Sequence, residues 1–152
     1  MTALIRYDRD TASGDQIAEH LRACDSEFNP PLSQRVEIGA YARKISAQAT
    51  RFEAWSDDAL IGLLALYCND TSARIAYITS VSVLGDWTGR GVARSLMVRC
   101  IDHAAAVGML SMQLEVAQTS VRAVRLYQSH GFSIQSGGEG LILTMRRPLA
   151  PA

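Results

Sequence analysis

The sequence predicts an α/β (α+β) fold in a single domain, with a mixed sheet and helices on both sides. Helix-like and strand-like segments follow one another in the order α α β β β α β α β β along 152 residues. The first strands form an antiparallel front, whereas the central strand–helix–strand unit predicts a parallel pair. No repeat or linker divides the chain, and its length suits one core, so we expect one domain over residues 1–152.

Two helices are predicted first. Residues 13–24 carry apolar positions at helical spacing, and either Ser13 or Asp15 can cap the start of this helix. After the chain-breaking segment 28–34, residues 35–49 predict a second helix. The face expected to be apolar on this second helix comprises Val36, Ala40, Tyr41 and Ile45.

Three strands are predicted next. Residues 51–55 and 59–68 are apolar and rich in strand-forming residues, and a hairpin is expected at 56–58. Residues 74–83 alternate as a third strand. The two faces expected from this alternation are Tyr77, Thr79, Val81 and Val83 on one side, and Ala76, Ile78, Ser80 and Ser82 on the other.

The second half of the chain alternates between helix and strand. A helix begins at residue 92, and Gly108 stands where it ends. The apolar stripe expected along one face of this helix comprises Val92, Ala93, Leu96, Met97, Cys100, Ile101, Ala104 and Ala105. The remaining predicted elements are a strand at 110–116, a helix at 120–130 stopped by Gly131, and a closing hairpin of 132–135 and 141–146 around 136–140.

Composition and charge narrow the classes of function. Basic and acidic residues number 15 each, which argues against nucleic acid and against a charged membrane surface as partners. No apolar run is long enough to cross a membrane, and the charged N-terminus lacks the apolar stretch of a signal peptide. Three widely spaced cysteines predict reduced thiols in a cytoplasmic protein, and no residue spacing predicts a metal site.

The stretch DWTGRGVARSL, residues 86–96, places two glycines at the start of a predicted helix. Glycine costs about 1 kcal/mol relative to alanine in a helix, so this start indicates that backbone approaches another group. An anion fits, because the first helical turn offers unpaired N–H groups and the positive end of the helix dipole. A nucleotide site is disfavoured, because no Lys-Ser/Thr pair follows and Arg94 replaces the third glycine of a dinucleotide motif. A turn without a ligand is the alternative.

The stretch resembles motif A of the GNAT superfamily of acetyl-CoA-dependent N-acyltransferases, Gln/Arg-x-x-Gly-x-Gly/Ala, which falls on residues 88–93. Residues 114–132, LEVAQTSVRAVRLYQSHGF, are similar to a later block of the same family, with Leu-Glu-Val, Asn-x-x-Ala-x-x-Leu-Tyr and Gly-Phe. Thr88 and Ser120 depart from the usual Gln/Arg and Asn. The resemblance implies a mixed, mostly antiparallel sheet of six or seven strands flanked by four helices.

The resemblance also implies a coenzyme site. Acetyl-CoA or coenzyme A would bind as a co-substrate, with backbone groups of the strand before motif A pairing with the pantetheine arm and one N–H polarising the thioester carbonyl. The glycine turn would hold the pyrophosphate. The residues expected to bind the coenzyme are Val81, Ser82, Val83, Thr88, Gly89, Arg90, Gly91, Val92, Ala93, Arg94, Ser120 and Tyr127.

Two residues are candidates for catalysis through the same resemblance. Tyr127 would give a proton to the leaving thiolate, and Glu115 would take the proton of the attacking amine, directly or through water. The structural alternatives are a core tyrosine packed on the sheet and a half-buried glutamate paired with an arginine. Thr79, Ser80 and Ser82 could instead hold a relay water.

The predicted function is transfer of the acetyl group of acetyl-CoA to a primary amine of a small molecule, such as an amino sugar or amine metabolite, by direct attack. Acetylation of a peptide or protein amine is one alternative, and a non-catalytic coenzyme A-binding or scaffold protein of the same fold is another. Monomer and homodimer are both open. The aromatic candidates for an acceptor pocket are Phe28, Tyr41, Trp55, Tyr67 and Trp87, although packing is the commoner role of such residues.

Overall fold

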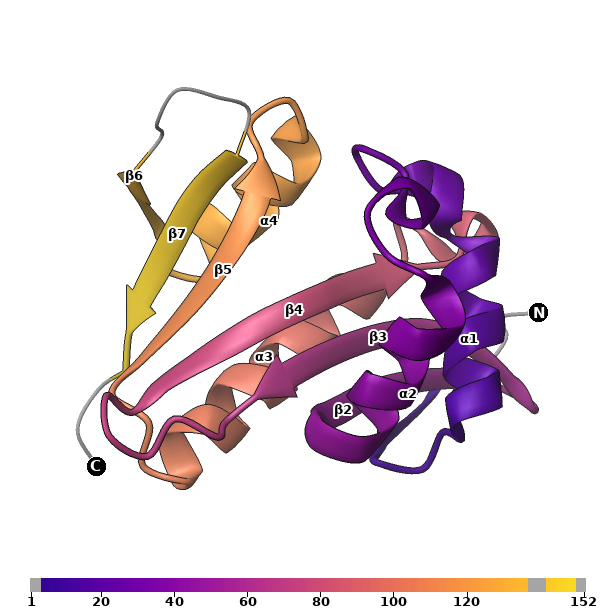
Figure 1. Cartoon of the computed structure of the whole chain (residues 1–152), viewed down its shortest axis with the longest axis horizontal. Helices are drawn as coiled ribbons and strands as arrows, with labels where there is room; N and C mark the ends of the chain where they lie inside the picture. Colours follow the sequence, from indigo (N-terminus) through magenta and orange to yellow (C-terminus); the bar gives the residue numbers. More distant parts are fainter. Residues whose placement is uncertain (1–3, 137–141, 150–152) are drawn as a thin grey trace.

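A single seven-stranded sheet organises the molecule, in the strand order β1-β2-β3-β4-β5-β7-β6 (Figure 1). The computed structural model describes residues 4–136 and 142–149. The turn predicted at 136–140 therefore lies almost wholly outside the described residues. The strands are β1 (Arg6–Arg9), β2 (Thr50–Ser56), β3 (Ala59–Tyr67), β4 (Ile75–Val83), β5 (Ser111–Ala117), β6 (Ser133–Ser136) and β7 (Ile142–Pro148), and the α-helices are α1 (Gly14–Ala23), α2 (Ile38–Gln48), α3 (Val92–Ala106) and α4 (Val121–Ser129).

The sheet is mixed, because β4 and β5 pair in parallel while the other neighbouring strands pair antiparallel. This arrangement confirms the predicted fold class. The strand β1 was not predicted, and it pairs with β2 from Arg6↔Trp55 to Arg9↔Phe52. Its four residues, Arg-Tyr-Asp-Arg, carry no apolar alternation, so only the edge of β2 identifies them as a strand.

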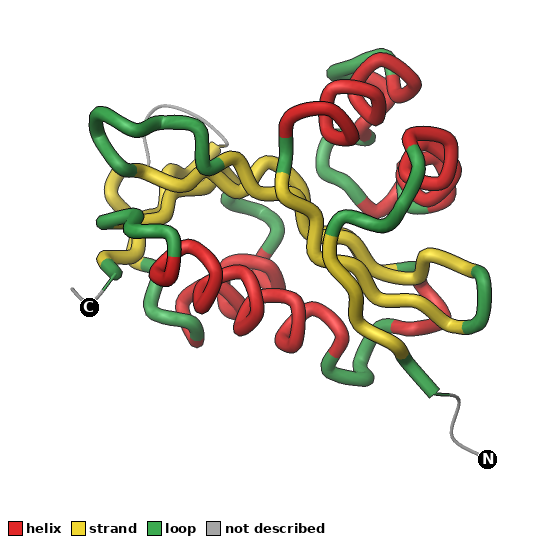
Figure 2. Tube along the Cα trace, turned by 90° about the horizontal axis from the view of Figure 1, so that it is seen from below, coloured by secondary structure: helices red, strands yellow, loops and turns green. Residues whose placement is uncertain are grey.

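Helices cover both faces of the sheet (Figure 2). Helices α3 and α4 pack in the core on one face, and α1 and α2 pack in the core on the other. Of the two predicted caps, Ser13 is the one that the structure shows, since its side chain accepts the Gln16 N–H at the start of α1. Helix α2 begins at Ile38, three residues later than predicted, and Glu37 caps it. Of the face expected to be apolar, Ala40 is wrong, since it is exposed, whereas Ile45 is buried and Val36 and Tyr41 pack partly buried against the same core. The buried residues of α2 are Ile38, Gly39, Ala42 and Ile45.

A β-bulge interrupts β4 at Thr79. Ala65 of β3 pairs with Ser80, whereas its neighbour Leu66 pairs with Ile78, so Thr79 has no partner of its own. The bulge exchanges the two faces of the strand, and the simple alternation predicted for 74–83 is therefore wrong. Val81 now shares the α3 face with Ile78.

Helix α3 packs closely on the sheet at Gly62 of β3. A Cβ atom at this position would lie 2.8 Å from Cγ1 of Val92, the first residue of α3. Because Val92 follows directly after the glycine turn, this close packing fixes the place of the turn relative to the sheet. The buried residues of α3 are Val92, Leu96, Met97, Cys100 and Ala104, all within the predicted apolar stripe.

Replacing Gly62 with alanine is expected to lower the free energy of unfolding by about 1–2 kcal/mol, because overpacking of a dense core displaces side chains. Urea denaturation monitored by circular dichroism measures this change. Gly14→Ala is the matched control, since a Cβ there meets nothing closer than 3.8 Å. A Gly62→Ala protein as stable as the parent would show that the packing of α3 on β3 does not require a glycine at this position.

Candidate active site

Strands β4 and β5 separate halfway along their length, which opens a gap inside the sheet (Figure 1). Their parallel pairing runs from Ile75↔Ser111 to Ile78↔Leu114 and stops there, directly before the bulge at Thr79. A cavity of about 190 Å³, here called the central cavity, fills the gap. Residues of β4, β5 and α4 line it, so three elements that are distant in sequence meet at one place.

The backbone of β4 faces this gap with unpaired polar groups. The N–H of Leu84 donates to the Ile61 carbonyl oxygen at 2.8 Å. This bond shows which residues of β4 direct their backbone groups toward β3 and which direct them away. Because backbone groups alternate in direction along an antiparallel pair, those of Ser82 point toward β3. Those of Val81 and Val83 point into the gap, where an extended ligand could pair with them as an added strand.

The glycine turn leads from β4 into α3. Gly89 and Gly91 have φ angles of +77° and +78°, a left-handed conformation that favours glycine. Gly91 caps α3, and the first bond from the cap joins the Ser95 N–H to the Gly91 oxygen at 3.0 Å. The N–H groups of Val92, Ala93 and Arg94 precede that bond and therefore have no partner within the helix. A Cβ on Gly91 would meet nothing within 4 Å, so the turn borders open space.

A second cavity of about 410 Å³, here called the phosphate-side cavity, lies over this turn. Arg94 and Arg122 line it, and Ala123 lines both this cavity and the central one, so the two cavities adjoin. Sequence reasoning missed Arg122, because its approach to the turn depends on how α4 packs. The guanidinium of Arg90 lies over the Trp87 ring, 4.7 Å from its centroid.

Thr88 also lines the phosphate-side cavity, but its polar groups already have a partner. Its hydroxyl donates to the Gly85 carbonyl oxygen at 2.8 Å, and its N–H donates to the same oxygen at 3.3 Å. Thr88 therefore shapes the turn more than it offers donors to a ligand. Ser120 lines the central cavity as the cap of α4, and its side chain makes no capping bond there.

Tyr127 and Glu115 approach the central cavity from opposite faces of the sheet. Tyr127 lies on the α3–α4 face, where its ring contacts Phe132 edge to face. Burial raises the pKa of the Tyr127 phenol to about 12, so it stays a proton donor across the working pH range. Leu114 packs on that same face, and Glu115, the next residue of β5, therefore points to the α1–α2 face. Glu115 is exposed and lines the cavity from there.

The serines of β4 have different surroundings. Ser82 Oγ lies 2.9 Å from His20 Nε2, and His20 Nδ1 lies 2.8 Å from the Leu60 carbonyl oxygen. Because a carbonyl only accepts, Nδ1 donates to it and Nε2 accepts the Ser82 proton. Burial lowers the pKa of His20, which favours this neutral ring. Both the hydroxyl and the backbone of Ser82 thus point away from the gap. Ser80 lines the central cavity, and its buried hydroxyl has no partner among the described residues.

A third cavity of about 410 Å³ lies on the α1–α2 side of β4 and β5 and is here called the open-face cavity. Tyr41 and Tyr67 line it, which brings two of the predicted aromatic candidates together. Phe28 lines the central cavity and Trp87 the phosphate-side cavity. Trp55 is a core residue, whose indole N–H donates to Glu53 at 3.3 Å.

The segment between α1 and α2 also contributes to the site. Asn29 Nδ2 donates to Thr119 Oγ1 at 2.6 Å, which joins this segment to the loop between β5 and α4. Arg35 lines both the central and the open-face cavity. Neither residue was predicted, because neither lies in a motif and the position of each depends on contacts with distant parts of the chain.

Over residues 4–136 and 142–149, no three metal-ligating side chains gather, and none of the helices there is long and apolar enough to cross a membrane. The three cysteines are unpaired. The cavities, the free edge of β4 and the glycine turn together form a site suited to an extended ligand that carries a phosphate group.

The model of the acetyltransferase (GNAT) family matches residues 14–132, and the chain belongs to this family. It is an acyltransferase, as predicted from the two sequence blocks. A comparison with curated protein sequences found no match.

Solved structures share the fold over nearly the whole chain at low sequence identity. Ribosomal-protein-S18-alanine N-acetyltransferase from Escherichia coli is 17% identical, with a TM-score of 0.76 over 98% of this chain and 96% of that one. The PaiA N-acetyltransferase from Thermoplasma acidophilum, in complex with coenzyme A, is 15% identical, with a TM-score of 0.70 over 97% and 99%. The putative acetyltransferase yncA from Salmonella typhimurium, with acetyl-CoA, is 16% identical, with a TM-score of 0.75 over 96% and 94%.

Proposed function

We propose that this enzyme transfers the acetyl group of acetyl-CoA to the primary amine of a small molecule. The observation that carries this proposal is the pair of adjoining cavities, which leads from the start of α3, along the free edge of β4, to Tyr127 and Glu115. Two similar proteins hold coenzyme A or acetyl-CoA in their structures, which supports the same coenzyme here.

The residues present fit the coenzyme. The free N–H groups at the start of α3 suit a pyrophosphate, and Arg94 and Arg122 add positive charge beside them. The unpaired backbone of Val81 and Val83 suits the amide groups of a pantetheine arm. Thr88, Gly89 and Ser120 border the same path, whereas Ser82 is not part of the coenzyme site that we propose.

The chain's own groups can handle both protons of the reaction. Acetyl-CoA supplies the activated acetyl group, and an N–H of Val81 or Val83 can polarise its carbonyl. Glu115 accepts the proton of the amine, directly or through one water, as the C–N bond forms. Tyr127 gives its proton to the sulfur as the C–S bond breaks, and solvent restores the phenol. The two residues lie on opposite faces of the gap, which keeps the two proton transfers apart.

A small acceptor suits the volume of the open-face cavity, since cavities of about 300–1,000 Å³ hold small molecules. An acceptor amine on a peptide or protein is the second candidate, favoured by the similarity to the E. coli enzyme named for ribosomal protein S18 alanine.

Thermal melts and an acceptor screen test the proposal. Acetyl-CoA is expected to raise the Tm, and ligand at 100 times its Kd adds about 2.7 kcal/mol of stability. ADP, which lacks the pantetheine arm, is expected to raise the Tm less. Release of free thiol with a panel of primary amines measures turnover. No shift of Tm with millimolar acetyl-CoA contradicts the coenzyme assignment. A shift of Tm without turnover on any small or peptide amine contradicts the proposed transfer to a primary amine.

A further inference from the structure

The open-face cavity continues from the central cavity along the sheet. The two cavities share five residues, Arg35, Ile78, Thr79, Leu114 and Glu115, so an acceptor held in one can reach the other. The shared residues lie beside the reaction centre. The rest of the open-face cavity lies farther along β4 and β3 and would hold the body of the acceptor.

Aromatic and aliphatic side chains line most of that far part. They are Tyr41, Tyr67, Tyr77, Leu32 and Val36, and the amide of Gln113 completes the lining. The Tyr41 hydroxyl donates to the Thr79 carbonyl oxygen at 3.0 Å, which holds its ring in place. The Tyr67 hydroxyl is buried and has no partner among the described residues. Such a lining favours an apolar or aromatic group with limited polarity.

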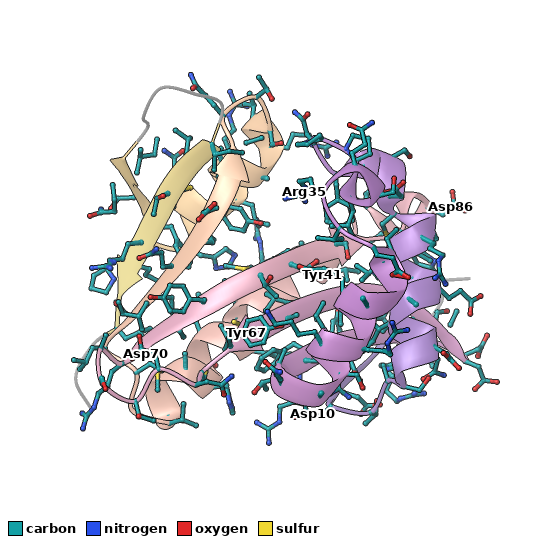
Figure 3. The ribbon with its side chains drawn as sticks, viewed as in Figure 1. Asp10, Arg35, Tyr41, Tyr67, Asp70 and Asp86 are labelled. Carbon is teal, nitrogen blue, oxygen red and sulfur yellow. The ribbon has the colours of Figure 1, made fainter. Side chains whose placement is uncertain are left out.

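The part of the open-face cavity that it shares with the central cavity carries one positive and one negative side chain. Arg35 and Glu115 line both cavities, and neither has an ion-pair partner within 4.0 Å in the described part of the chain. Glu27 lines the central cavity but not the open-face cavity. Figure 3 shows Arg35, Tyr41 and Tyr67 in a row on the α1–α2 side of the sheet, with Tyr41 between the other two.

A polycationic acceptor does not fit this arrangement, because Arg35 would repel its additional ammonium groups. An acceptor that carries a carboxylate beside its amine fits both charges, since a guanidinium binds a carboxylate through paired hydrogen bonds. The body of such an acceptor would extend from Arg35 toward the three tyrosine rings.

We propose that the acceptor is an α-amino acid with an aromatic or large apolar side chain, whose carboxylate binds Arg35 while its side group lies among Tyr41, Tyr67 and Tyr77. The inference rests on the proposed function, since the amine of this amino acid receives the acetyl group. Arg35 is then a specificity-determining residue that contacts the acceptor and takes no part in proton transfer.

The test compares L-phenylalanine with 2-phenylethylamine, which differ only in the carboxylate. Free-thiol release gives kcat/KM for each amine with the parent enzyme and with Arg35→Gln. We expect the parent to favour L-phenylalanine, and Arg35→Gln to reduce this preference about tenfold, as suits a charge-assisted hydrogen bond at an exposed site. Arg35→Lys keeps the positive charge but loses the paired hydrogen bonds. Its preference for L-phenylalanine should therefore lie between that of the parent enzyme and that of Arg35→Gln.

Arg22→Gln is the matched control, because Arg22 is exposed on α1 and lines none of the three cavities. It should change the preference less than twofold. Transfer to 2-phenylethylamine as efficient as to L-phenylalanine, or a preference that survives both Arg35 substitutions, overturns the inference and leaves the proposed function in place. A Tm shift with acetyl-CoA but no transfer to any amine contradicts the proposed function, and the inference with it.

Discussion

Gly91→Glu is expected to abolish the stabilisation of the protein by acetyl-CoA. The new carboxylate would stand at the cap of α3, beside the N–H groups that we assign to the pyrophosphate. Two like charges about 4 Å apart repel by about 4 kcal/mol at an effective dielectric constant of ~20. Because the turn is exposed, we expect at least a hundredfold loss of affinity, measured by isothermal titration calorimetry with acetyl-CoA.

Any side chain at Gly91 strains the backbone, so the effect of the charge must be compared with that of an uncharged residue at the same position. Its φ of +78° is unfavourable for other residues, so Gly91→Glu should also lower the free energy of unfolding by about 1–2 kcal/mol without ligand. Gly91→Asn is the control, because asparagine tolerates this conformation and adds no charge. The cap borders open space, so neither side chain meets a neighbour at Cβ. Near-normal binding by Gly91→Glu would show that the phosphates bind elsewhere.

Tyr127→Phe is expected to lower kcat at least tenfold while the affinity for acetyl-CoA stays similar. The substitution keeps the ring that packs against Phe132 and removes only the hydroxyl. General acid catalysis is typically worth about 10²–10⁴-fold. Burial raises the pKa of Tyr127 to about 12, so transfer to a thiolate whose thiol titrates near ~8.5 is uphill. The benefit must therefore come from a well-placed hydrogen bond to the sulfur, and the expected effect lies near the lower end of that range.

Single-turnover kinetics with a fixed amine measure this step, and thermal melts measure the structural effect. Tyr7→Phe is the matched control, since Tyr7 lies on β1 under the Arg99 guanidinium and lines none of the three cavities. We expect both variants to melt within a few degrees of the parent. An unchanged kcat in Tyr127→Phe would mean that water protonates the sulfur. A matching loss of Tm and of all activities would mean that the hydroxyl is structural.

Local patterns in the sequence were enough for most elements and for the family. Ser13 caps α1 with a partner three residues away, and the buried stripe of α3 follows helical spacing. The glycine turn is recognisable for the same reason, because its left-handed residues and free N–H groups belong to one short stretch of chain. Such features depend on neighbours in sequence, and a single sequence therefore contains them.

The features of the fold that were not predicted depend on pairing between distant segments. The bulge at Thr79 exists only in the register between β3 and β4, and it decides that Val81 faces α3 while Ser82 bonds to His20. The strand β1 is likewise defined only by the edge of β2.

The site itself combines features that the sequence alone predicts with features that depend on contacts between distant segments. The sequence determined that a glycine turn, a glutamate on a strand and a tyrosine on a helix occur in the order of an acetyltransferase. Only the tertiary structure brought Arg35 and Tyr67 to the same side of the sheet as Glu115, and placed Arg122 beside the turn. Each of these contacts joins elements that are far apart in the chain, and their side chains meet only because the sheet, its gap and its helices have a fixed geometry.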